Sequence, residues 1–238
     1  MVIPLAVQIQ IDNAEREMHG RADHALLPAY RQRIYRSMDA LDEVTAKRWH
    51  SWLDVLTARR ALPVWDRNPH FEPGDFDEPY LYPEGMLTLA ERILQGEDIV
   101  EQANRTAGYN HYVSGNLLGD SAEEMDTDDL DSVFAVRSAY AYAAALAALR
   151  TALCNPIPAR YFAEVSANET LRDESEEMSY KNGNRDTASC AVVAVAGADW
   201  ISFGCVSSSD PQERQSFWTW WLQETMPNAY ERAARVKS

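Results

Sequence analysis

The acidic run Asp126–Asp131 contains the residues of this chain best suited to hold a metal ion. A calcium-binding loop of the EF-hand type has oxygen ligands at positions 1, 3 and 5, glycine at position 6 and glutamate at position 12. A loop that started at Asp126 would have Leu130 at position 5, and one that started at Glu124 would have Ala135 at position 12. Both registers fail, and the run fits better at the first turn of a helix, where negative charge complements the helix dipole.

The spacing of the histidines and the absence of phosphate-binding motifs indicate no catalytic centre. No two histidines lie four residues apart, and the sequence has no HExxH pattern. GxGxxG, GxxxxGKS/T and GxSxG patterns are absent as well. We therefore expect no catalytic residue, no metal ligands and no cofactor. One enzymatic alternative stays open, a small all-α metal-dependent hydrolase that uses Asp and Glu ligands with His70 or His111.

The negative charge of the chain is concentrated in residues 68–131. This stretch has 16 Asp and Glu against 2 Arg, in a chain whose net charge is −15. Like charges repel, so a cluster of this size costs folding stability and needs an explanation beyond solubility. Docking of a basic protein would offset that cost, and complementary charge would speed the association. Nucleic acid is excluded as a partner, because binding a polyanion needs a basic surface.

Two acidic segments are expected to form the face that binds this basic partner. The first, Glu72–Glu78, lies in a stretch rich in proline and aromatic residues that predicts an ordered loop. The second, Asp120–Asp131, combines a polar loop with the first turn of a helix. The candidate partner-binding residues are Glu72, Asp75, Asp77, Glu78, Asp120, Glu123, Glu124, Asp126, Asp128, Asp129 and Asp131.

Cysteine usage and hydropathy indicate a cytoplasmic protein. An odd number of cysteines without a CxxC pair fits neither a disulfide framework nor a zinc knuckle, and small buried hydrophobes are the better interpretation. These are Cys154, Cys190 and Cys205. The N-terminal apolar stretch Met1–Val7 is short and lacks the basic residues of a signal peptide. The longest uncharged runs, Ser138–Leu149 and Thr187–Ala198, are about half the length of a membrane span.

Apolar periodicity and helix-ending residues predict an all-α protein. We expect a single globular domain over residues 1–238, of about eight helices with Pro-marked loops, whose first 20 residues form a peripheral helix. Ala188–Ala196 is ambiguous between helix and strand, and helix is favoured because Gly197 follows. The alanine-rich section Ser138–Leu149 predicts a central helix that its neighbours approach closely. The expected helices are Gln8–His19, Ala29–Met38, Asp42 (as N-cap) to Pro63, Glu84–Gln95, Asp98 to about Leu117, Leu130–Leu153, Ala188–Ala196, Gln212–Thr225 and Asn228–Val236.

Three segments together resemble a known family. They are WHSWLDVLTARRALPVWD at 49–66, PEGMLTLAERILQG at 83–96 and FWTWWLQETMPNA at 217–229. Their order and spacing are similar to those of the predominantly α-helical immunity protein 5 family of bacterial polymorphic toxin systems. The resemblance extends from about Leu27 to the C-terminus.

The resemblance implies a cytoplasmic antidote that binds a cognate toxin domain and protects the cell that makes it. It supplies no catalytic residue, and the matching residues fit core and turn positions rather than a reaction. These are Trp52, Leu56, Pro63, Trp65, Trp218 and Trp221. The acidic segments lie outside the resembling motifs. A third hypothesis, beside the antidote and the hydrolase, is a scaffold or homodimer that uses the tryptophan-rich segment Phe217–Leu222 as an interface, although packing of that segment in the core is favoured.

Overall fold

The computed structural model describes residues 2–67, 81–110, 130–153, 186–197 and 210–235. All regular structure in these ranges is helical, which confirms the all-α fold class. The buried hydrophobic residues of the described ranges form one cluster, to which every helix from the N-terminal to the C-terminal one contributes. None of the described helices is long and apolar enough to cross a membrane.

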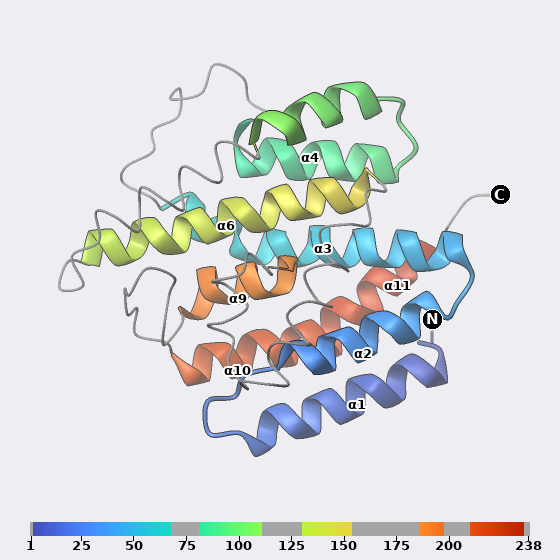
Figure 1. The fold of residues 1–238 in the computed structure, drawn as a ribbon, viewed down its shortest axis with the longest axis vertical. Coiled ribbons are helices and arrows are strands. Elements are labelled where there is room, and N and C mark those ends of the chain that lie inside the picture. Colours follow the sequence, from blue (N-terminus) through green and yellow to red (C-terminus); the bar gives the residue numbers. More distant parts are fainter. Residues whose placement is uncertain (1, 68–80, 111–129, 154–185, 198–209, 236–238) are drawn as a thin grey trace.

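The N-terminal third forms helices α1 (Leu5–Gly20), α2 (Pro28–Asp39) and α3 (Glu43–Trp65). Helix α1 lies at the edge of the bundle, packed on α2 and α10 (Figure 1). The predicted N-cap of α3 is confirmed, because the Asp42 carboxylate accepts a hydrogen bond from the Thr45 backbone N–H at 2.9 Å.

The predicted end of α3 at Pro63 is wrong, because the helix continues through Pro63 to Trp65. A proline inside a helix removes a backbone hydrogen bond and costs about 3 kcal/mol. Burial of Trp65 offsets this cost, since its ring is 6% exposed and lies 5.3 Å from the ring of Tyr142. A favourable tertiary contact beyond the proline thus outweighs the local signal.

Helix α4 (Pro83–Leu94) and a further helix over 100–110 cover one side of the bundle (Figure 1). The predicted stop at Gly96 is confirmed, because this glycine has φ +91°, which side-chain-bearing residues rarely adopt. The second helix was expected to extend to about Leu117, and the part beyond residue 110 lies outside the described residues.

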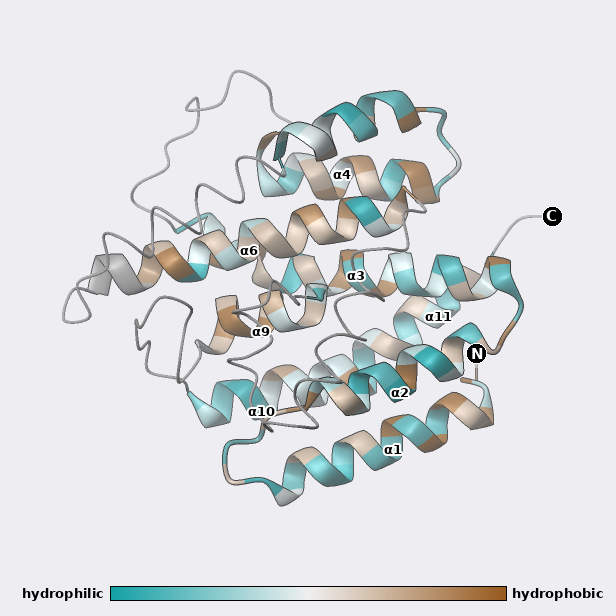
Figure 2. Ribbon diagram, viewed as in Figure 1, coloured by the Kyte–Doolittle hydropathy of each residue, from teal (hydrophilic) through white to brown (hydrophobic). Residues whose placement is uncertain are grey.

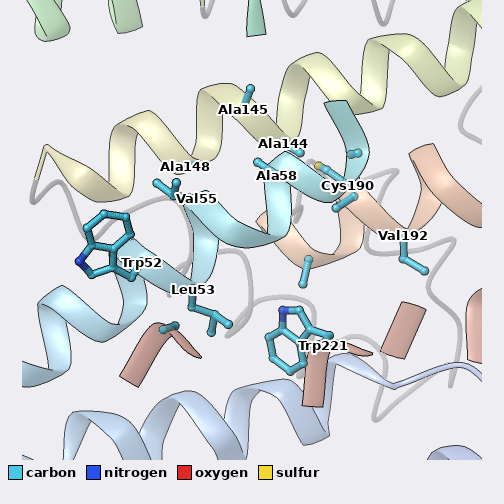
Figure 3. Packing of buried hydrophobic residues seen from close by; sticks show 14 of the residues in the cluster. Trp52, Leu53, Val55, Ala58, Ala144, Ala145, Ala148, Cys190, Val192 and Trp221 are labelled. Atoms are coloured by element: carbon cyan, nitrogen blue, oxygen red, sulfur yellow. The ribbon is translucent and has the colours of Figure 1, made fainter. Parts of the chain in front are cut away.

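Helix α6 (Leu130–Ala152) lies at the centre and packs against α3, α4 and α9 (Figure 1). Figure 3 shows Ala144 and Ala148 of α6 facing Val55 and Ala58 of α3. All four side chains are at most 1% exposed. Such small side chains let the two helix backbones approach closely, which is the role expected of the alanine-rich section.

Helix α9 (Thr187–Ala196) confirms the helical interpretation of this ambiguous segment. Asp186 and Ser189 form a capping box at its start, and Gly197 ends it with φ +70°. Its Cys190 is buried, as expected of a small apolar residue. The other two cysteines lie outside the described residues.

The C-terminal residues form one continuous rod of α10 (Pro211–Trp220), the π turn η2 (Trp221–Thr225) and α11 (Met226–Ala234). The expected N-cap Asp210 accepts hydrogen bonds from two backbone N–H groups. The expected break before Pro227 is wrong. The π turn shifts the hydrogen-bond register by one residue, with the Met226 N–H bonded to the Trp221 carbonyl, so the proline follows without interrupting the rod.

The tryptophan-rich segment is packed within the core, as favoured from its sequence. Phe217, Trp218 and Trp221 are each at most 1% exposed, and their rings meet edge to face. The Trp221 indole N–H donates to the Thr57 hydroxyl at 3.0 Å and the Trp49 indole N–H to the Met226 carbonyl at 3.1 Å. Figure 2 shows hydrophilic residues interspersed with hydrophobic ones along α1 and α2.

Candidate functional site

The predicted partner-binding residues fall almost entirely outside the described residues. Glu72, Asp75, Asp77 and Glu78 belong to 68–80, and the second group from Asp120 to Asp129 belongs to 111–129. Asp131 lies in the first turn of α6. The structure therefore describes the helix ends that flank the two acidic segments.

The helix ends that flank both acidic segments lie toward the same end of the bundle, which we call the acidic end. The C-terminal ends of α3 and of helix 100–110, and the N-terminal ends of α4 and α6, all lie on the left in Figure 1. Side-chain contacts join these helices, and the contact of α6 is made from its middle. The Tyr142 ring packs on Trp65, and its hydroxyl donates to Asn110 Oδ1 at 2.7 Å. Arg59 of α3 bonds Glu84 in the first turn of α4.

Acidic residues between the two segments are mostly paired with arginines. Arg59 contacts Glu84 at 3.1 Å and Glu91 at 2.7 Å. Arg92 bonds Glu97 at 2.7 Å, and Arg105 lies 4.0 Å from Glu101. By contrast, the two segments at 68–80 and 111–131 contain 11 acidic residues and no Lys or Arg. These 11 residues are the candidates named above, and the chain joins both segments directly to the helices described here.

Like-charge crowding is already visible at this end in the described residues. Partial burial, and then the negative charge of Glu84, raise the pKa of Asp66 above its ordinary value. Asp66 directly follows α3 and precedes the first acidic segment. Further acidic groups placed nearby would add to this repulsion, and a basic partner would relieve it.

A charged cluster in the core contains a buried ion pair. Arg31 of α2 donates from Nε to Asp186 Oδ2 at 2.8 Å, and both side chains are 1% exposed. The Tyr35 hydroxyl donates to the same carboxylate at 3.3 Å. Burial favours a raised pKa for Asp186, but the charge of Arg31 and hydrogen bonds from Ser189 and Arg31 outweigh it and lower the pKa.

Asp54 of α3 lies beside this ion pair, and its pKa is shifted in the opposite direction, upward. Its carboxyl is 3% exposed and accepts a hydrogen bond from the Thr151 hydroxyl at 2.7 Å. Burial and, less strongly, the charge of Asp186 raise its pKa, the Thr151 hydroxyl lowers it, and the resulting pKa is about 7. A carboxyl with this pKa is able to exchange a proton near neutral pH.

This core cluster is structural rather than catalytic in the described conformation. The side chains of Arg31, Asp54 and Asp186 are at most 3% exposed. A substrate in solution therefore cannot reach them. Through them α2, α3, α6 and α9 are joined. No pattern in the sequence predicted this cluster. The capping-box pattern of Asp186 and Ser189 marks a helix start, but nothing local marks its partner 155 positions away.

The histidines add no metal site within the described residues. His50 contacts Asp39 at 2.9 Å, and among the described residues no group of three His, Cys, Asp or Glu is placed to hold a metal ion. His70 and His111, which the hydrolase alternative requires, lie outside the described residues. That alternative has gained no support.

Comparison with known proteins agrees with the resemblance seen in the three segments. The model of the family described as Immunity protein Imm5 matches residues 11–228. A search of curated proteins gives no match. The matched range runs from α1 into α11 and includes the helices that build the core and those that flank the acidic segments. The chain therefore belongs to the Imm5 family of immunity proteins.

Proposed function

We propose that this chain is a cytoplasmic antidote that binds the toxin domain encoded beside it and inhibits it stoichiometrically, without turnover. The carrying observation is family membership over residues 11–228. The proposed binding face consists of the 11 acidic residues of 68–80 and 111–131, and the complementary partner is a basic domain. The contacts of Tyr142 with Asn110 and of Arg59 with Glu84 support this assignment, because they join helices that flank the two acidic segments in the chain.

Electrostatic steering is the physical advantage of such a face. Complementary charge raises association rates from about 10⁵–10⁶ to 10⁸ M⁻¹s⁻¹ or more. An antidote benefits from this speed because it must capture its toxin before the toxin acts. The helical core, including the buried tryptophans and the Arg31–Asp186 pair, would hold the acidic segments in place without contacting the toxin.

Neutralising part of this face should slow toxin capture. We expect the fourfold variant Asp126→Asn, Asp128→Asn, Asp129→Asn and Asp131→Asn to associate about tenfold more slowly at low salt, and its rate to depend less steeply on salt concentration. Stopped-flow fluorescence with the neighbouring toxin domain measures both quantities. Titration calorimetry of the unmodified pair should give one antidote per toxin.

A matched variant distinguishes the effect of the acidic face on the association rate from the effect of the overall net charge. Asp12→Asn, Glu15→Gln, Glu17→Gln and Glu224→Gln also remove four negative charges, from α1 and the π turn, far from α4 in the bundle (Figure 1). Its association rate should stay within about twofold of the unmodified protein. Equal slowing by both variants would show that overall charge, rather than the acidic segments, steers the toxin, and unchanged rates for both would remove steering altogether.

A further inference from the structure

A basic pocket of about 680 Å³ opens at the other end of the bundle from the acidic end. Its walls come from the N-terminal half of α3, the C-terminal end of α4 and α11, which lie on the right in Figure 1. Three arginines and one glutamate line it, in a chain whose net charge is −15. The lining charged residues are Arg48, Glu231, Arg232 and Arg235.

Two hydrogen-bond donors in this pocket lack an acceptor among the described residues. They are the indole Nε1 of Trp52 and Nε of Arg48, which stand one helical turn apart on α3. Trp52 is 6% exposed, and Figure 3 shows its ring nitrogen turned away from Val55 and Leu53 in the core. Buried donors are almost always satisfied, so two unsatisfied donors that line one pocket indicate an acceptor supplied from outside.

The charges of the pocket select an anion as that acceptor. The Arg232 guanidinium lies over the Trp52 ring, 4.9 Å from its centre. Arg235 forms an ion pair with Glu231, so the one carboxylate of the pocket is already neutralised. At the end of α4, the Leu94 carbonyl accepts from Arg48 Nη2 at 3.1 Å. The charges of the pocket that no carboxylate in it neutralises are therefore those of Arg48 and Arg232, and both are positive.

We infer that this pocket binds one oxyanion, a carboxylate or a phosphate group, through Trp52 Nε1, Arg48 Nε and the guanidinium of Arg232. An oxyanion offers two or more acceptor oxygens to these separate donors, and charge-assisted hydrogen bonds of this kind are the strong ones. The pocket volume leaves space for the molecule that carries the group. This inference does not depend on toxin binding, since it concerns a different end of the bundle.

The indole resonances of the seven tryptophans report directly on this site. The variant Trp52→Phe keeps an aromatic ring, loses no hydrogen bond within the described residues and identifies the Trp52 N–H signal by its disappearance. We expect a saturable downfield shift of that signal when ¹⁵N-labelled protein is titrated with sodium phosphate or sodium acetate at constant ionic strength, and no such shift with sodium chloride. Tighter binding of phosphate would assign the site to phosphorylated ligands, and tighter binding of acetate to carboxylates.

Two arginine variants distinguish anion binding in the pocket from a general effect of positive charge. Arg232→Gln should weaken anion binding about tenfold or more, because it removes the guanidinium that lies over the Trp52 ring. Arg60→Gln is the matched control, since Arg60 is also exposed and lies over a tryptophan ring, that of Trp220 at 5.2 Å. It should leave the affinity unchanged. Equal effects of the two variants, or a Trp52 signal that no oxyanion moves, would overturn the inference.

Discussion

Replacing Arg31 with methionine is expected to lower the free energy of unfolding by about 3–5 kcal/mol. The substitution leaves the Asp186 carboxylate 1% exposed without the guanidinium that bonds it at 2.8 Å. It also removes the donor to the Leu26 carbonyl, at 2.5 Å, and the cation over the Trp218 ring, 5.3 Å from its centre. Urea denaturation followed by tryptophan fluorescence and by circular dichroism measures the change.

Two comparisons test whether burial of the pair causes this loss. Arg59→Met breaks the contacts of Arg59 with Glu84 and Glu91, whose side chains are 56% and 25% exposed, and should cost about 1 kcal/mol or less. Adding Asp186→Asn to Arg31→Met should recover part of the stability, because the amide keeps the cap of α9 and buries no charge. A cost for Arg31→Met no larger than for Arg59→Met would show that the pair contributes little.

Local signals in the sequence predicted most helix boundaries correctly. Asp42 and Asp210 act as N-caps, and Gly96 and Gly197 end their helices. These features depend on a few neighbouring residues, so a single sequence is enough to find them. Helix α1 begins at Leu5 rather than Gln8, and two further errors came from prolines. Pro63 does not end its helix, because burial of the Trp65 ring beyond it stabilises the last turn. Pro227 does not break its helix, because a π turn precedes it.

Long-range contacts explain why the sites were harder to predict. The excess of negative charge in 68–131 is visible in composition, but the packing of the helices that flank it depends on contacts such as Tyr142 to Asn110. In the pocket, Arg48 and Trp52 look like ordinary helix residues until α11 places Arg232 over the ring. The Arg31–Asp186 pair joins residues 155 positions apart and left no local pattern at Arg31.

Because Asp54 is protonated in the folded protein, the free energy of unfolding should fall as the pH rises from about 4 to about 7. Burial and the charge of Asp186 raise its pKa to about 7 in the folded chain, whereas the pKa of an unfolded aspartate is about 3.9. Between these values the folded state holds a proton that the unfolded state releases, so stability falls as pH rises and levels off above pH 7. A difference of about 3 pKa units corresponds to at most about 4 kcal/mol.

The variant Asp54→Asn isolates this contribution, because its amide stays neutral at every pH. Its free energy of unfolding relative to the unmodified protein should rise by about 3 kcal/mol between pH 4.5 and pH 8. Other titrating groups are common to both proteins and cancel in the difference, while Asp186, whose pKa is lowered, affects stability only below this range. Asp12→Asn, at an exposed site of α1, should give a difference that is flat with pH. A flat difference for Asp54→Asn as well would mean that the Asp54 carboxyl is ionised in the core and is stabilised there by the Thr151 hydroxyl.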